Sequence, residues 1–155
     1  MQIKNFFCYV ISKPLFGLTE DKLKEHEITS CSHQQVMSQG WAPVIGDQLL
    51  YEDHDAQLLA LKQEKRLLPA SVVNEYLQAK IEQFEDAEGY RPGRKLRQQM
   101  KEDITHELLP KAFIKSSQTN ILILPKLKLL FVLTGSSKTA DDATAYLRNT
   151  LGSLP

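Results

Sequence analysis

This 155-residue chain has few cysteines, few glycines and no long apolar stretch. The two cysteines, Cys8 and Cys31, lie in unrelated contexts, and no signal peptide precedes the first predicted strand, so we expect a cytoplasmic protein. The most apolar run, residues 121–133, is interrupted by a proline and two lysines and is too short to span a bilayer. The glycines are scattered at turns, and the chain has no glycine-rich phosphate loop, Gly-x-Ser-x-Gly turn or Cys-x-x-Cys pair. We therefore expect a protein that is not an enzyme and needs no cofactor.

The composition is that of an ordinary globular protein. Hydrophobic residues make up 42% and charged residues 25% of the chain. A chain of this length can bury a substantial core without disulfides. We expect one domain over residues 1–155.

The formal net charge is zero, yet the charges are segregated along the chain. Residues 89–115 contain three acids and seven bases, namely Arg91, Arg94, Lys95, Arg97, Lys101, Lys111 and Lys115. The preceding stretch, residues 71–88, has five acids and one base, Lys80. A basic stripe attracts a polyanion such as DNA, because phosphates bind Lys and Arg and release counterions. The alternative is that the stripe is simply a solvated helix face.

The first half of the chain predicts strands around one short helix. We expect a buried strand over Ile3–Ile11 that ends at Lys13-Pro14, and a short helix capped by Thr19 and extending to His26. A loop over Thr29–Gln39 is closed by the turn Gly40–Pro43, in which Trp41 serves for packing. A hairpin then joins Leu49–Tyr51 to Gln57–Leu61 and leads into the charged edge Lys62–Arg66.

Two antiparallel helices are predicted in the middle of the chain. Apolar residues recur at helical spacing from Val73 to Phe84, and the pattern stops near Gly89. A second helix, with an apolar residue every four positions from Leu96 to Leu108, ends before Pro110. On this second helix, Arg94, Arg97 and Lys101 fall within an arc of about 60° beside the apolar stripe, so we expect them to point outward together.

The last third predicts two strands and a helix. The strands are Asn120–Leu124 and Leu129–Thr134, and the helix starts at Thr139, has Asp141 and Asp142 in its first turn, and stops at Gly152. The expected fold class is therefore α+β, with a mainly antiparallel sheet and an antiparallel helix pair that projects a basic finger.

Three weaker functional hypotheses come from polar residues outside the stripe. Cys31, His33 and His26 form a possible metal-ligand set, although a single Cys-x-His occurs in many loops by chance. A hairpin turn containing Glu52, Asp53, His54 and Asp55 is a possible divalent-cation site for phosphodiester cleavage, against the alternative of a solvated turn. His106 follows the basic stripe and is a possible phosphate contact at low pH, against the alternative of a solvated helix end.

Several short segments, in order along the whole chain, resemble the RdgC family of recombination-associated proteins. They are Lys4-Asn5-Phe6, Gly40-Trp41-Ala42-Pro43, Glu64-Lys65-Arg66-Leu67-Leu68-Pro69, Leu108-Leu109-Pro110-Lys111-Ala112-Phe113, Ser117-Gln118-Thr119, and the closing Leu147-Arg148 with Leu151-Gly152-Ser153-Leu154-Pro155. The resemblance implies a bacterial or phage protein, associated with the nucleoid, that binds double-stranded DNA without sequence preference. It also implies a ring-shaped dimer around the duplex that restrains the recombinase RecA.

The resemblance also implies roles for individual residues. Arg94 and Lys95 match the basic finger that faces DNA in the family, and Arg97 and Lys101, with Arg91, extend that surface. Phe113 matches an aromatic residue at a dimer contact, and its alternative role is ordinary core packing.

The length of the chain is where it departs from the family, whose members are about twice as long. With only one of the two dimer contacts, we expect an open pair rather than a closed ring. The alternative function is a protein-interaction module that pairs with a full-length RdgC through Phe113, or caps a recombination enzyme with its acidic helix and hairpin.

Overall fold

The computed structural model describes residues 3–12, 15 and 17–152. The expected break at Lys13-Pro14 therefore lies outside the described residues. The chain divides into two compact units, which we call the sheet unit (residues 1–29, 39–63 and 116–155) and the hairpin unit (residues 30–38 and 64–115).

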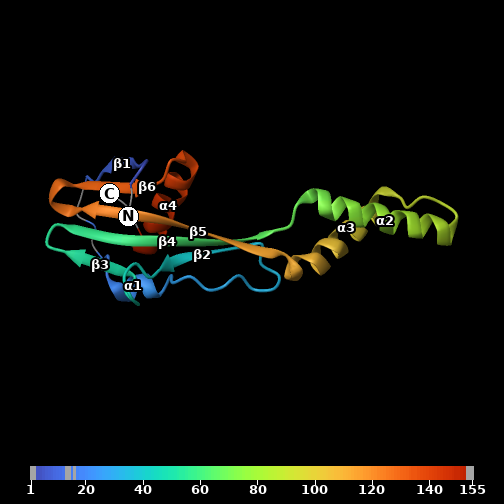
Figure 1. Cartoon of the computed structure of the whole chain (residues 1–155), viewed down its shortest axis with the longest axis horizontal. Coiled ribbons are helices and arrows are strands. Elements are labelled where there is room, and N and C mark those ends of the chain that lie inside the picture. The colour runs from blue at the N-terminus through green and yellow to red at the C-terminus, as the bar shows by residue number, and fades with distance from the viewer. Residues whose placement is uncertain (1–2, 13–14, 16, 153–155) are drawn as a thin grey trace. The chain divides into compact units, whose positions relative to one another are not determined.

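A six-stranded antiparallel sheet and four helices give the α+β class that the sequence predicts (Figure 1). The strands follow the order β1-β6-β5-β4-β2, with β3 paired to β4. Their bounds are β1 Phe7–Val10, β2 Met37–Ala42, β3 Leu50–Asp53, β4 Ala56–Leu67, β5 Phe113–Leu124 and β6 Leu129–Leu133. The helices are α1 Glu20–Lys24, α2 Ala70–Glu88, α3 Arg94–Leu108 and α4 Ser137–Leu151, with short 3-10 turns at Leu109–Lys111 and Pro125–Leu127. Among the described residues, no helix combines the length and apolar character needed to cross a membrane.

Strand β1 lies at the edge of the sheet and is only half-buried. Phe7 and Tyr9 face the core, whereas Cys8 and Val10 are exposed. The predicted first strand is confirmed, but its expected burial was wrong, because a run of apolar residues does not distinguish a central strand from an edge strand with one solvated face.

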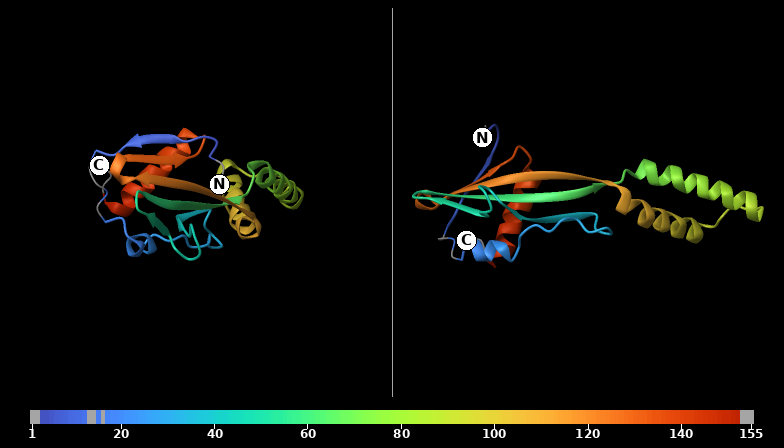
Figure 2. Two further views of the ribbon diagram at one scale, coloured as in Figure 1. Left: turned by 60° about the vertical axis from the view of Figure 1, so that its left-hand side comes forward. Right: turned by 60° about the horizontal axis from the view of Figure 1, so that its bottom comes forward.

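The core of the sheet unit lies between the sheet and α4 (Figure 2). Ile121, Ile123 and Leu130 of the central strands are buried, as are Ala143 and Leu147 of α4. All five residues of β6 are apolar, but their burial alternates along the strand between buried and partly exposed, as expected for side chains that point to opposite faces of the sheet.

Trp41 is fully buried at the centre of this core, which confirms its predicted packing role. Its indole Nε1 donates a hydrogen bond to Thr150 Oγ1 at 3.0 Å, and its ring lies edge-on to Tyr146. The loop predicted over Thr29–Gln39 is confirmed for residues 29–36, but residues 37–42 form β2, so the turn predicted at Gly40–Pro43 was wrong. Gly40 permits this arrangement: a Cβ at that position would lie 2.4 Å from the main chain of Ile28.

Two boundaries in the last third also differ from the predictions. Strand β5 begins at Phe113 rather than Asn120, because residues 113–118 have exposed side chains and so show no alternating apolar pattern. Helix α4 is capped by Ser136, whose hydroxyl accepts a hydrogen bond from the Thr139 main-chain N–H at 3.3 Å. The predicted start at Thr139 was therefore two residues late, and the first turn contains no acid.

The hairpin unit contains the predicted antiparallel helix pair (Figures 1 and 2). Val73 and Ile81 of α2 and Met100 and Ile104 of α3 are buried where the two helices pack. Gly89 ends α2 with a left-handed φ of 76°, a conformation that glycine adopts without strain.

Two further predictions concern the sheet unit. The hairpin of strands β3 and β4 and the short helix α1, capped by Thr19, are both confirmed.

Candidate nucleic-acid interface

Three exposed cations occupy the first turn of α3. Arg94, Lys95 and Arg97 are all exposed, and within the described part of the chain no carboxylate lies at ion-pair distance from any of them. Their charges are therefore available to a ligand.

The three acids of α3 all have partners other than these cations. Glu107 forms an ion pair with Lys111, and the other two accept hydrogen bonds from glutamines. Gln98 donates a side-chain hydrogen bond to Glu102 at 2.9 Å, and Gln99 donates one to Asp103 at 3.0 Å. Both pairs are four residues apart, the spacing that brings side chains together on a helix surface. Glu102 and Asp103 are thus paired with neutral amides rather than with the cations of the first turn.

Arg91 and Lys101 differ from the three cations of the first turn. Arg91 Nε lies 3.2 Å from Glu85 Oε1 near the end of α2, in a pair that is exposed on both sides. Exposed ion pairs contribute about 0–1 kcal/mol, so a phosphate can replace this carboxylate at low cost. Lys101 is half-buried, since its position on α3 lies next to the buried Met100.

The N-terminus of α3 adds positive potential at the same place. Its N-cap is Gly93, which has no side chain to accept hydrogen bonds from the first N–H groups, and the first turn contains no acid. Unsatisfied N–H groups and the helix dipole both favour an anion here. This helix end was not predicted from the sequence, although a glycine directly before Arg94-Lys95 at a helix start is a signal for it.

Phe113 is 85% exposed, so its alternative assignment to the core was wrong. The residues just before it are held by Arg66, which is only 7% exposed. Arg66 Nη1 donates to the main-chain carbonyls of Leu109, Pro110 and Ala112 at 3.2, 3.2 and 3.3 Å, and Nη2 donates to those of Cys31 and Ser32 at 3.4 and 3.2 Å. The segment Lys62–Arg66, which was expected to be a charged edge, therefore contains two buried charged residues, Arg66 and Glu64. The Glu64 carboxylate accepts a hydrogen bond from the Cys31 N–H.

The acidic β3–β4 turn has its carboxylates engaged by neighbours. Asp53 accepts hydrogen bonds from the main chain and side chain of His54, and these bonds lower the pKa of the Asp53 carboxyl. Asp55 forms an ion pair with Lys126, and Glu52 accepts a hydrogen bond from Gln57 at 2.6 Å.

The suggested metal ligands each have other surroundings. Cys31 is buried and its Sγ donates to the Gln35 carbonyl at 3.1 Å, whereas His33 and His106 are exposed. The His26 ring lies edge-on to Tyr146. Across residues 3–12, 15 and 17–152, no three His, Cys, Asp or Glu side chains are grouped so that they could hold a metal ion.

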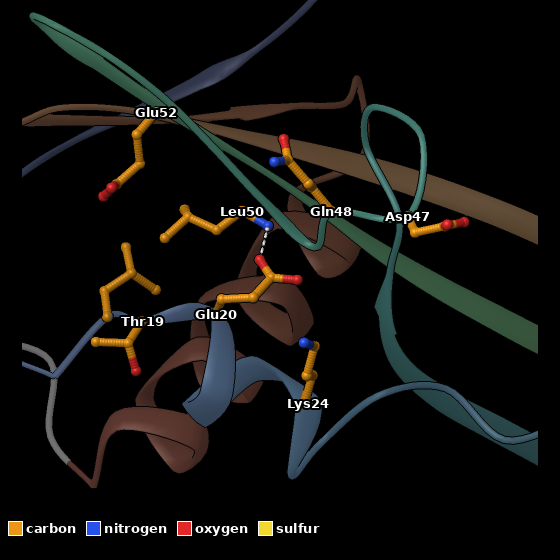
Figure 3. A pocket seen from close by; sticks show the side chains of 8 residues that line it. Thr19, Glu20, Lys24, Asp47, Gln48, Leu50 and Glu52 are labelled. Carbon is orange, nitrogen blue, oxygen red and sulfur yellow. Dashed lines mark hydrogen bonds between the residues drawn. The ribbon is translucent and has the colours of Figure 1, made fainter.

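A hollow of about 560 Å³ in the sheet unit lies between α1 and the start of β3 (Figure 3). Glu20 points into it, but its two oxygens accept hydrogen bonds from the main-chain N–H groups of Leu49 and Leu50 at 3.0 and 2.8 Å. This carboxylate therefore ties α1 to β3. The contact joins residues 29 and 30 positions apart in the chain, so no local sequence pattern signals it.

The fold and the site together define an α+β protein with an exposed cationic helix end. Comparison with known proteins is more specific: the sequence model described as "Putative exonuclease, RdgC" matches residues 1–155. The chain belongs to the RdgC family. It is 37% identical to the recombination-associated protein RdgC of Tolumonas auensis, 34% to that of Shewanella sp. strain ANA-3 and 35% to that of Proteus mirabilis. The matches cover 98 to 100% of this chain and 52 to 53% of those relatives, so the chain spans about half their length.

Proposed function

We propose that this chain binds double-stranded DNA without sequence preference, through Arg94, Lys95, Arg97 and Lys101 and with a contribution from Arg91. The observation that supports this most directly is the absence of carboxylate partners around the first three side chains within the described residues. Cations that are already neutralised would release no counterions on binding, whereas these would.

Phosphates, rather than base edges, are the expected contacts. Arg and Lys at a helix N-terminus reach phosphate oxygens, and such contacts orient a protein on DNA without reporting its sequence. Acidic α2, which packs beside α3, would repel the backbone and so restrict which side of the hairpin unit approaches DNA.

The proposal also includes a homodimer, which the exposed side chain of Phe113 supports. A large apolar side chain this exposed usually marks a protein contact, and the carbonyls held by Arg66 fix the chain that leads to it. The family's association with recombination makes obstruction of RecA or of a nuclease on nucleoid DNA the proposed consequence of binding. In this proposal the protein acts by occupying DNA, not by catalysing a reaction.

The decisive experiment is DNA binding as a function of salt. With about four phosphates neutralised per protomer, log K should fall against log salt with a slope near −3.6, or roughly a hundredfold between 50 and 200 mM. Duplexes of unrelated sequence should bind equally. A salt-insensitive complex would contradict the proposal, as would strong preference for one sequence.

A second function, pairing with a full-length RdgC or capping a recombination enzyme, is favoured by the exposed Phe113 and the acidic surface of α2. A gel shift with random duplex, repeated after addition of a full-length RdgC, separates the two. No shift by this chain alone, together with altered DNA binding by the partner, would favour the second function.

A further inference from the structure

The loop between α2 and α3 presents an exposed aromatic ring. Tyr90 is 61% exposed in the five-residue connection, residues 89–93. It directly precedes Arg91 and lies four residues before Arg94, so its Cα is at most about 15 Å from that of Arg94. The loop that carries Tyr90 therefore leads directly into the cationic first turn of α3.

The Tyr90 ring is held in place rather than free. It packs edge-to-face on Phe84 of α2, with ring centroids 5.4 Å apart and an interplanar angle of 89°. The rest of the loop is constrained as well: Gly89 caps α2, Pro92 is buried, and Arg91 contacts Glu85. Little conformational entropy remains to be lost when such a ring contacts a ligand.

A fixed ring beside a row of cations has the chemistry of a base-stacking residue. Cations hold the sugar-phosphate backbone, and an aromatic ring next to that backbone reaches the bases attached to it. Within a continuous duplex each base face is covered by its neighbours, so the ring gains a partner only where a base face is exposed.

We propose that Tyr90 stacks on an exposed base, and that the protein therefore prefers DNA in which a duplex adjoins an unpaired base, a frayed end or a single strand. This inference rests on the proposed phosphate contacts of α3 and adds a structural preference to them. The hydroxyl of Tyr90 is not required, since stacking uses the π face.

Tyr76 provides a matched control. It is also an exposed tyrosine of the hairpin unit, but it lies on α2 directly after Glu75, away from the cations in sequence. Phosphate would be repelled there, so Tyr76 should not reach a base.

The test compares a 20-base-pair duplex with the same duplex containing one unpaired 2-aminopurine. Wild-type protein should bind the second at least about fivefold more tightly and quench its fluorescence, since stacking on one base gives such a factor or more. Tyr90→Leu keeps an apolar contact on Phe84 but removes the π face, so the preference and the quenching should disappear. Tyr90→Phe and Tyr76→Leu should retain both.

The result that overturns the inference is a wild-type protein without preference, or a Tyr90→Leu variant that keeps it. If the intact duplex still binds with the expected salt dependence, only the stacking role fails. If neither DNA binds, the proposed phosphate contacts fail too. Thermal unfolding of Tyr90→Leu separates lost stacking from lost structure, and Tyr90→Phe gives the same comparison should the leucine variant not fold.

Discussion

The Arg66 guanidinium donates from Nη1 to the main-chain carbonyl of Ala112 at 3.3 Å, one residue before the exposed ring of Phe113. A buried side chain of β4 thus holds the start of β5 from inside the hairpin unit. Carbonyls hydrogen-bonded to a buried cation lose those partners when the cation is removed.

Replacing Arg66 should therefore destabilise the protein strongly. We expect Arg66→Met to lower the free energy of unfolding by at least about 2 kcal/mol, because buried carbonyl groups are left without donors. Lys65→Met, at the exposed neighbouring position of the same strand, should change it by less than about 0.5 kcal/mol. Urea denaturation of both variants checks this, and equal stability would contradict the role given to Arg66.

Changing Phe113 should affect association without affecting folding. Phe113→Ser removes an exposed ring, so we expect little loss of stability but a shift from dimer to monomer in size-exclusion chromatography with light scattering. Leu127→Ser, another exposed apolar residue, is the control and should leave the oligomeric state unchanged. A wild-type protein that is monomeric at all concentrations would refute the proposed contact.

Neutralising the first turn of α3 should reduce the salt dependence of DNA binding. With Arg94→Gln and Lys95→Gln combined, two phosphate contacts are lost and the slope of log K against log salt should become less negative by about 1.8. The loss should be the same for duplexes of unrelated sequence. Lys80→Gln, which removes an exposed cation from acidic α2, should leave the slope unchanged, and a similar change in this variant would show that only overall charge matters.

An added carboxylate at the start of α3 should compete with phosphate. Gly93→Asp supplies an N-cap acceptor to the N–H groups that the structure leaves without a side-chain cap, so folding stability should hold or rise slightly. DNA affinity should nevertheless fall about fivefold, because a negative charge then occupies the anion-binding end of the helix. Gly93→Ala, for which the surrounding space is open, should bind DNA normally. Unchanged affinity in the aspartate variant would remove the helix end from the site.

Gly40→Ala should be severely destabilising. The new Cβ would lie 2.4 Å from both the main-chain N and the Cα of Ile28, whose N–H donates to the Trp41 carbonyl at 2.9 Å. Because main-chain atoms must move, we expect a loss of about 2–3 kcal/mol, which thermal unfolding would detect. The same substitution at Gly93 meets no such contact and is the control. A stable Gly40→Ala protein would mean that the two segments separate easily.

Several features could be predicted from sequence because each depends on neighbours in the chain. The helix pair, its break at Gly89 and the cap at Thr19 follow from local periodicity and capping chemistry, and all three are confirmed. The cationic first turn of α3 was likewise apparent from residue order. The half-burial of Lys101 was not, because it depends on how far the apolar stripe extends around the packed helix.

Other features depend on partners far away in sequence, and these were missed. Residues 37–42 looked like a loop because Gly40 and Pro43 suggest a turn, yet Gly40 is needed for close approach to Ile28. Arg66 looked like a surface charge, since nothing in its own strand shows that it meets the carbonyls of residues 31, 32, 109, 110 and 112.

The sequence alone determined the segregation of charge, the two amphipathic helices and the resemblance to a family, because these are properties of residue order. Tertiary structure decided which charges are left without a carboxylate, which aromatic rings are exposed and which charged residues are internal. Those outcomes depend on tertiary contacts. Phe84 and Glu85 contact the loop that carries the exposed Tyr90. Arg66 donates its hydrogen bonds to main-chain carbonyls distant in sequence and is therefore not available to a ligand.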